Sequence, residues 1–473
     1  MMNYRVVILM LAILVTVVFS EEKSVTSTSG SRKSVEVTVY NGNFGFVKEI
    51  REIKVPSGEN ELQVADVAAL INPVTVYAKS TNYPDDFLIL EQNYEYDLIS
   101  HQKLMEKYVG KKIKIIDQNE YKDRKDVVEA QLLSVNNGEV YKIDEQIYLG
   151  YPGLKVLPEI PDNLVEKPTL IWKIKTKKSQ KHKIEISYLT NGITWNADYV
   201  LVCSNKDNKG SLNGWVTIEN RCGAAFSDAT LKLVAGNVNK IEKPARMMLS
   251  KRAEAAYDNS YSPQFAEESI HEYHMYDLQR KTVLKDNQTK QISLLESGTL
   301  KIDKEYLVEG ESYGITQRYS KRDYKVPVQV YLNFRNSKEN GLKMPLPAGN
   351  VRIFTADSKG RQQFIGEDHI DHTPENGMVQ LKSGEAFDII AEKKQTSFKQ
   401  ISTQLWESEW KVELKNHKND AVTVGVVQPM MGNWEIVKSN YDYEKIDAFK
   451  VMFKIPVKKQ GEAELSYQVK VGL

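Results

Sequence analysis

Two short histidine clusters are the residues of this chain with the clearest potential for chemistry. His271 and His274 lie in the segment His-Glu-Tyr-His, and His369 and His372 flank Asp371 in a second segment. A helical zinc site needs histidines four positions apart, and on a strand two residues three positions apart face opposite sides. The first cluster therefore fits a helical or strand site poorly, whereas His369, Asp371 and His372 could supply two ligands on one turn. We expect structural roles for both clusters and predict no metal site and no cofactor.

The sequence lacks the other common catalytic motifs. A nucleophile elbow, a phosphate-binding loop, the dinucleotide-binding glycines and a zincin helix are all absent. Adjacent carboxylates occur at Asp85-Asp86 and Glu367-Asp368, but such pairs are common in loops. A glycosidase needs two acids that face each other across a cleft. We therefore predict no catalytic, cofactor-binding or metal-ligating residues, and the pattern favours a protein that is not an enzyme.

The charge balance argues against a nucleic-acid partner. The 473 residues include 64 lysines and arginines against 63 aspartates and glutamates, so the net charge is only +1. Binding to DNA, RNA or an anionic membrane surface generally uses an excess of basic residues on one face. An apolar fraction of 41% is sufficient for buried cores, and the chain is longer than one ordinary domain. The composition therefore predicts a multi-domain protein that does not bind nucleic acid.

The first 20 residues have the pattern of a secretory signal peptide. Arg5 is followed by an uncharged, largely apolar run from Val6 to Ser20, and Glu21 ends this run. The run is shorter than the ~20 apolar residues of a transmembrane helix and fits the core of a signal peptide. We predict cleavage after Ser20 and export to the periplasm, the cell surface or the medium. An uncleaved N-terminal membrane anchor is the alternative, and no later segment is apolar enough to span a bilayer.

The chain has only two cysteines, Cys203 and Cys222. In an oxidising compartment such a pair could form a disulfide, which requires Cβ atoms within about 4.5 Å of each other. A hairpin that turns near Lys209 would instead place Cys203 opposite a residue near Trp215. Two alternatives therefore stay open, a disulfide and a pair of small buried thiols.

Alternating apolar and polar residues predict a mainly β, multi-domain protein of antiparallel sandwiches or barrels. Residues 97–109 have the best helical spacing after the signal segment, and Gly110 supplies a stop signal. Residues 97–168 are expected to hold this short helix, a small barrel-like β-unit with a turn at Asn136-Asn137-Gly138, and a proline-rich linker. The other predicted segments are a signal helix at 1–20, a flexible tether at 21–34, a β-domain at 35–96 and one or more C-terminal β-sandwich domains at 169–473.

The C-terminal segment should contain a central group of strands and a mobile loop. Residues 188–238 hold short apolar runs separated by Asn, Asp, Gly and Ser, a pattern typical of strands and turns. Trp195, Tyr199 and Trp215 fall within these runs, so we expect them to pack in the core or across strands. Residues 239–268 are rich in small and polar residues, which predicts a mobile, exposed loop.

Seven sequence motifs follow one another along the chain, and their order helps to identify a family resemblance. The motifs are SYLTNGITWNADYVL, LNGWVTIEN, ATLKLVAGNVN, EYHMYDL, MPLPAGNVRIF, GEDHIDHTPEN and SGEAFDI. From about residue 188 to the C-terminus they resemble the domain-of-unknown-function 4139 family. The earlier segments VYNGNFGFVKEI and VPSGENELQVADVAALINP resemble the β-rich N-terminal region of many such proteins. Members are exported bacterial and archaeal proteins, some described as mucoidy-inhibitor-like, so the resemblance implies an all-β envelope protein. It implies no catalytic residues.

These observations favour an exported cell-envelope protein without enzymatic activity. We expect it to bind an envelope protein or a polysaccharide through strand edges, loops or exposed aromatic residues. The alternative is a hydrolase of cell-wall or exopolysaccharide material, which would need two carboxylates about 5–10 Å apart in a cleft. The sequence leaves open the ligand, the oligomeric state and whether there is any catalysis.

Overall fold

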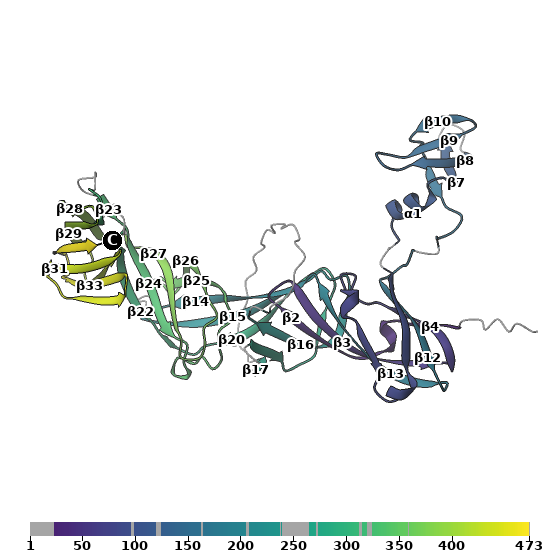
Figure 1. The fold of residues 1–473 in the computed structure, drawn as a ribbon, viewed down its shortest axis with the longest axis horizontal. Coiled ribbons are helices and arrows are strands. Elements are labelled where there is room, and N and C mark those ends of the chain that lie inside the picture. Colours follow the sequence, from purple (N-terminus) through teal and green to yellow (C-terminus); the bar gives the residue numbers. More distant parts are fainter. Residues whose placement is uncertain are drawn as a thin grey trace, which may run out of the picture. The chain divides into compact units, whose positions relative to one another are not determined.

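The computed structural model of this protein is built mainly of β-strands, which confirms the predicted fold class (Figure 1). It describes residues 23–472 except 96–98, 120–123, 162–163, 205–207, 237, 239–263, 271–272, 312–314, 319–323 and 358, so the predicted signal segment lies outside the described residues. Short 3-10 segments occur at Ser29–Ser31, Pro73–Thr75, Pro84–Asp86 and Lys338–Asn340. No helix within the described ranges has the length and apolar character needed to cross a bilayer.

The chain divides into two compact units, and each is assembled from distant segments. Unit 1 comprises Met1–Glu36, Phe46–Asn191 and Cys222–Ala229, and unit 2 comprises Val37–Gly45, Gly192–Arg221 and Thr230–Leu473. The chain passes between the units within strands β2 (Arg32–Tyr40), β3 (Phe44–Val55) and β16 (Phe226–Ala235). This division differs from the predicted boundaries, because a strand that serves both units carries no break in its alternating pattern.

Unit 1 contains a four-stranded sheet, and its first strand lies in the segment that was predicted to be a flexible tether. Its order is β1 (Lys23–Ser27), β4 (Gly58–Ala65), β12 (Thr169–Thr176) and β6 (Leu88–Glu95), and a second pair joins β13 (Gln180–Asn191) to β5 (Tyr77–Ser80). Residues 21–34 were expected to form a flexible tether, but β1 pairs in parallel with β4 over its whole length. Main-chain pairing does not need apolar side chains, so the polar composition of β1 gave no signal.

A short helix and a small sheet form a separate core within unit 1. Helix α1 spans His101–Tyr108, inside the predicted 97–109, and Ser100 caps it by accepting a hydrogen bond from the amide of Lys103 at 3.2 Å. The sheet follows the order β10 (Gln146–Leu149), β9 (Val140–Ile143), β8 (Arg124–Ser134), β7 (Lys112–Asn119) and β11 (Leu154–Val156). Met105 and Tyr108 of the helix pack on Leu132 and Tyr141 of the sheet, so the helix covers its apolar face.

The central sheet of unit 2 is built on the predicted strands of residues 188–238. Its order is β20 (Gln288–Glu296), β15 (Lys209–Asn220), β14 (Ile193–Cys203), β25 (Gly349–Ala356) and β26 (Gln362–Ile370), with β21 (Leu300–Lys301) beside β15. β14 and β25 are parallel, and Gly349 lies against the carbonyl oxygen of Ala197 with no room for a Cβ atom. Gly349 is therefore required by the close approach of two strands.

A second group of strands in unit 2 shortens the predicted mobile loop. β18 (Tyr273–Leu278) pairs with the end of β16 and with β17 (Phe265–Ile270), and β19 (Thr282–Leu284) follows. Residues 239–263 of the predicted loop lie outside the described residues. Residues 265–268 belong to β17, so the loop prediction was wrong at its C-terminal end, where antiparallel pairing satisfies the backbone.

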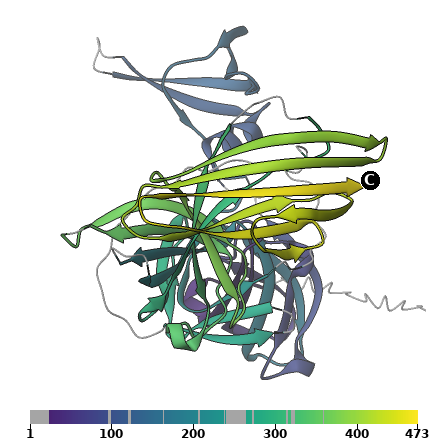
Figure 2. The same cartoon turned by 90° about the vertical axis from the view of Figure 1, so that its left-hand side faces the viewer.

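The C-terminal part of unit 2 is a β-sandwich, shown in green to yellow in Figure 2. One sheet has the order β27 (Met378–Glu385), β24 (Val328–Arg335), β22 (Asp303–Glu309), β30 (Val422–Pro429), β33 (Lys450–Val457) and β32 (Tyr443–Asp447). The other has the order β23 (Tyr324–Val326), β28 (Ile389–Ser402), β29 (Leu405–Asn416), β34 (Gly461–Gly472) and β31 (Asn433–Ser439). Side chains of both sheets, such as Val426 and Val412, share one buried core.

Candidate functional site

The two histidine clusters singled out in the sequence come together in unit 2. His274 lies on β18, His369 on β26 and His372 just beyond β26. Burial lowers the pKa of His372, Asp371 raises it, and the nearby His274 and His369 lower it further. The imidazoles thus influence one another although they come from segments about a hundred residues apart. His271 lies outside the described residues.

Each described imidazole of this group already has a partner at Nδ1. His274 Nδ1 is 2.7 Å from Glu267 Oε1, and His369 Nδ1 is 3.2 Å from Asn350 Oδ1. His372 Nδ1 accepts a hydrogen bond from the amide of Ala348 at 3.1 Å. Over the described ranges, no group of three or more histidine, cysteine, aspartate or glutamate side chains is placed to hold a metal ion. His274 thus links β18 to β17, His369 links β26 to β25, and His372 holds the segment just before β25.

The aromatic residues of the central strands pack as the sequence predicts. Trp195 and Tyr199 are fully buried, and Trp195 Nε1 donates to the carbonyl oxygen of Val234 at 3.2 Å. Tyr199 donates its hydroxyl hydrogen to the carbonyl oxygen of Pro347 at 2.8 Å. Trp215 lies half-buried on the other face of β15. Buried aromatic rings with satisfied polar atoms stabilise a core, so Trp195 and Tyr199 offer no binding surface.

The cysteines and the adjacent carboxylates also have structural surroundings. Cys203 and Cys222 are both buried free thiols, so the open question of a disulfide is answered in favour of two unlinked cysteines. Asp368 Oδ2 accepts from the amide of Lys382 at 2.7 Å, and Asp86 Oδ2 accepts from Gln180 Nε2 at 2.7 Å. These carboxylates anchor neighbouring segments of chain.

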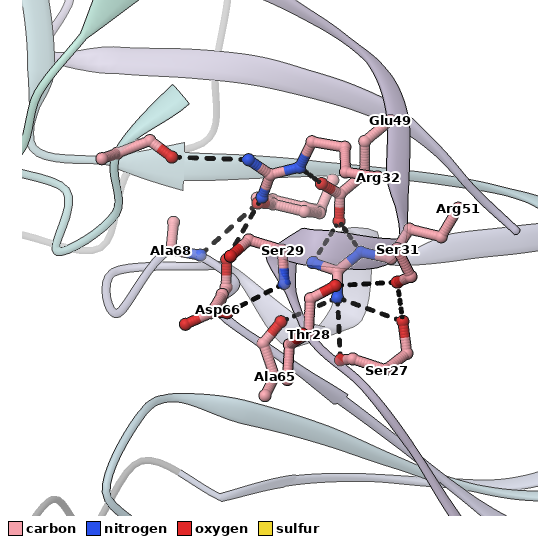
Figure 3. Close-up of polar contacts among 12 residues, drawn as sticks. Ser27, Thr28, Ser29, Ser31, Arg32, Glu49, Arg51, Ala65, Asp66 and Ala68 are labelled. Carbon is pink, nitrogen blue, oxygen red and sulfur yellow. Dashed lines mark hydrogen bonds and ion pairs between the residues drawn. The ribbon is translucent and has the colours of Figure 1, made fainter. Parts of the chain in front are cut away.

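A buried network of charged residues in unit 1 escaped the sequence reasoning (Figure 3). Glu49 and Arg51 are fully buried on the inner face of β3. Glu49 Oε1 accepts from Arg51 Nε at 2.9 Å, while Glu49 Oε2 accepts from Arg32 Nε at 2.5 Å. One signal for this network was available in the sequence. Glu49 and Arg51 are two residues apart on a strand whose other inward-facing positions are apolar. A charged pair at such positions predicts a buried ion network.

The same network holds the first strand in place. Arg51 Nη1 donates to the carbonyl oxygens of Ser27, at the end of β1, and Ala65, at the end of β4, at 3.0 and 2.8 Å. Tyr188 lies beside the network, and burial followed by the charge of Glu49 raises the pKa of its phenol. The guanidinium of Arg51 therefore clamps the ends of two parallel strands. This arrangement accounts for the order of a polar segment that has no apolar periodicity.

The best candidate for a binding surface is one side of the C-terminal sandwich, which we call the sandwich edge. It consists of β31 and β32, each of which ends its sheet with a hydrogen-bonded neighbour on one side only among the described strands. Val437 of β31, Tyr443 and Ile446 of β32, and Phe449 in the turn after β32 are exposed by 49%, 38%, 51% and 59%. Exposed apolar side chains are ordinary when scattered, but here they gather on two consecutive strands and the turn that follows them.

The backbone of the sandwich edge directs two of these side chains outward. The pairing of β31 with β34 shifts between Ile436 and Lys438, and the pairing of β32 with β33 shifts between Lys445 and Asp447. Val437 and Ile446 are the residues left out of register. A β-bulge re-aims a side chain and makes an edge a poor template for further strand pairing. The edge thus presents apolar side chains while its backbone resists strand addition.

A tryptophan braces the sandwich edge between its two strands. Trp434 of β31 donates from Nε1 to the carbonyl oxygen of Ala448 at 2.8 Å, and the ammonium of Lys445 lies 4.5 Å from its ring centroid. Tyr443 packs on the buried ring of Phe453, with centroids 6.0 Å apart. These contacts fix the exposed side chains on a rigid support, which reduces the entropy lost when a partner binds.

Comparison with known proteins adds no family assignment. No protein-family model matches the chain, and no curated protein matches it. The resemblance to the domain-of-unknown-function 4139 family therefore stays a prediction.

Proposed function

We propose that this protein is an exported, non-enzymatic β-protein of the cell envelope that binds an envelope protein or polysaccharide through the sandwich edge. The observation that carries the proposal is a pair of bulges on consecutive edge strands of the two sheets, where Val437 and Ile446 are exposed by 49% and 51%. Bulges are usual next to sites where a strand must aim a side chain. Their coincidence with large apolar residues on both strands favours a role in recognition.

The chemistry of the sandwich edge fits a partner with an apolar face and dispersed polar groups. Tyr443 and Phe449 supply aromatic surface, which suits both protein side chains and the faces of sugar rings. Glu444 Oε2 of β32 and Lys454 Nζ of the neighbouring strand β33 form an exposed ion pair at 2.9 Å. A small apolar centre surrounded by charged residues is the usual anatomy of an interface between proteins that also exist apart.

Three serine substitutions test the surface. The variant V437S/I446S/F449S should fold normally, since exposed substitutions change stability by about 0.5 kcal/mol or less each. Its affinity for the partner should fall at least tenfold, because aromatic and aliphatic anchors commonly contribute more than ~1 kcal/mol each. The natural protein would first be screened against a glycan array, isolated wall material and exported proteins, and dissociation constants then measured for each binder.

A matched control carries serine at exposed apolar positions of another sheet, Leu149 and Leu154, which are exposed by 88% and 73%. L149S/L154S should bind as tightly as the natural protein. Equal binding by both variants, or no binder in any of the three screens, would overturn the proposal. Export is tested separately: the protein should fractionate with the envelope or medium and begin at Glu21 after processing.

A further inference from the structure

A lysine is buried in the core of the C-terminal sandwich against a glutamine. Lys393, on β28, is 1% exposed, and Gln428, on β30, is fully buried. Lys393 Nζ lies 2.5 Å from Gln428 Oε1. Since a carbonyl bond is about 1.23 Å long, Nζ can be no farther than about 3.7 Å from the carbonyl carbon Cδ. That separation is close to the ~3–3.5 Å of a geometry poised for attack.

The amide of Gln428 is held in one orientation by four hydrogen bonds. Its Nε2 donates to the backbone oxygens of Glu311 and Pro429 at 3.1 and 2.9 Å. Its Oε1 accepts from the Tyr467 hydroxyl at 2.9 Å as well as from Lys393. An amide flip would exchange two donors for two acceptors and is excluded by this pattern. The carbonyl group therefore faces Lys393 with two donors on its oxygen.

Burial makes the neutral amine of Lys393 more available than that of an exposed lysine. It lowers the pKa of Lys393 to about 8, and the charge of Glu311 opposes part of that change. With this pKa, roughly a tenth of the side chain carries a free electron pair at pH 7. A lysine with a lowered pKa in an apolar site can therefore act as a nucleophile near neutral pH.

Gly310 lies so close to this pair that no other residue fits at its position. A Cβ atom at Gly310 would stand 2.5 Å from Gln428 Oε1, 2.9 Å from Lys393 Nζ and 3.1 Å from Gln428 Cδ. The amide of Gly310 also donates to the carbonyl oxygen of Val427 at 2.7 Å, which fixes the segment against β30. All the atoms that would react thus converge beside one residue without a side chain.

We propose that Lys393 and Gln428 join spontaneously in an intramolecular isopeptide bond with release of ammonia. The Nζ electron pair forms a bond to Cδ, and the carbonyl electrons move onto Oε1. The resulting tetrahedral intermediate collapses as the Cδ–Nε2 bond breaks. One proton passes from Nζ to the departing Nε2, so a neutral amine and a primary amide give a secondary amide and one ammonia molecule. No oxidant, reductant or cofactor is consumed.

Residues already in place support this step. The Tyr467 hydroxyl donates to Oε1, where negative charge develops in the intermediate, and such a donor acts most strongly in a dry site. Lys393 belongs to the five-stranded sheet and Gln428 to the six-stranded sheet, so the bond would fasten the two layers of the sandwich together. This inference is independent of binding at the sandwich edge.

Intact-mass measurement of the purified natural protein tests the bond. The protein should be lighter than its processed sequence by the mass of one ammonia molecule. K393M and Q428M should have full calculated masses, because each lacks one reacting group. K394M is the matched control, since Lys394 is the exposed neighbour on the same strand, and it should keep the deficit.

Peptide mapping locates the deficit without relying on the fold of any variant. Trypsin should yield residues 383–394 linked to residues 419–438, with no cleavage after Lys393. A succinimide at an Asn-Gly site such as Asn137-Gly138 also loses ammonia, and the map separates the two products. Full mass in the natural protein, separate 383–393 and 419–438 peptides, or a deficit that persists in K393M would each overturn the proposal.

Discussion

The two units of this protein each bury a cation, and they treat it in opposite ways. In unit 1, Arg51 and Arg32 both pair with Glu49, and Arg51 also bonds to two backbone oxygens. In the C-terminal sandwich of unit 2, Lys393 faces the neutral amide of Gln428. A guanidinium stays charged at any accessible pH, whereas an ammonium can lose its proton. The first arrangement therefore preserves charge as a clamp, and the second makes a nucleophile.

The comparison shows that the partner decides what a buried cation does. A carboxylate offsets the cost of desolvating a guanidinium, and removing one partner leaves a buried charge without compensation. An amide offers only a dipole, so burial outweighs the opposing charge of Glu311 and lowers the pKa of Lys393 to about 8. Substitutions in the two regions should therefore lower the stability of the fold for different reasons.

The largest expected effect comes from Glu49→Gln. This change leaves Arg32 and Arg51 buried with no negative charge, so the free energy of unfolding should fall by about 3–5 kcal/mol. Urea titration of the full chain, followed by circular dichroism, would measure the loss. Hydrogen exchange should also speed up in β1, which Arg51 anchors.

The matched control is Glu52→Gln on the same strand. Among the residues that the structure describes, Glu52 pairs with two exposed lysines, Lys33 at 4.0 Å and Lys181 at 3.6 Å. The change should therefore cost less than about 1 kcal/mol. Equal losses for Glu49→Gln and Glu52→Gln would show that burial of the network does not matter to stability.

A smaller loss of about 2–4 kcal/mol is expected for Lys393→Met. The substitution removes the proposed bond between residues 35 positions apart. Such a cross-link stabilises the folded state by about 4 kcal/mol through the lower entropy of the unfolded chain. The apolar packing of the methionine should recover part of this stability. The unfolding midpoint of the sandwich should drop relative to Lys394→Met. Unchanged or increased stability would mean that Lys393 forms no constraint and that its burial is simply costly.

The smallest effect should come from Asp66, an ion pair at the margin of the unit 1 network. Burial raises the pKa of Asp66, but hydrogen bonds from Lys167 and the amide of Ser29 outweigh it and lower the pKa to about 2. The folded state therefore gains stability above the unfolded pKa near 4 and loses it as pH falls towards 2. Asp66→Asn should reduce this acid-dependent loss of unfolding free energy by about 1 kcal/mol. The effect is small because Lys167 is exposed to solvent. Superimposable pH–stability curves would contradict the assignment.

Much of the β-architecture could be predicted from the sequence. Apolar residues at every second position of a strand show directly which face of the strand is buried. Val35, Val37 and Val39 alternate in the sequence and are buried in β2. Strand β1 could not be predicted, because the guanidinium of Arg51 and main-chain pairing hold it rather than apolar burial. The sequence also carries no mark of the division into two units, since β2 and β3 contribute to both without a change of pattern.

The candidate sites were harder to predict because each depends on pairing between distant strands. Val437 and Ile446 look like ordinary strand residues, and only the register shifts show that they point outward. Lys393 and Gln428 come together across two sheets, and no local motif marks either residue. Glu49 and Arg51 were also not predicted, although a charged pair on an otherwise apolar strand face is visible in the sequence.

A crystal structure at a resolution that separates bonded from hydrogen-bonded atoms tests the central comparison most directly. The account predicts continuous density from Lys393 Nζ to Gln428 Cδ and no Nε2 atom, alongside discrete hydrogen bonds between Arg51 and Glu49. An intact Gln428 amide with a separate lysine ammonium would contradict it.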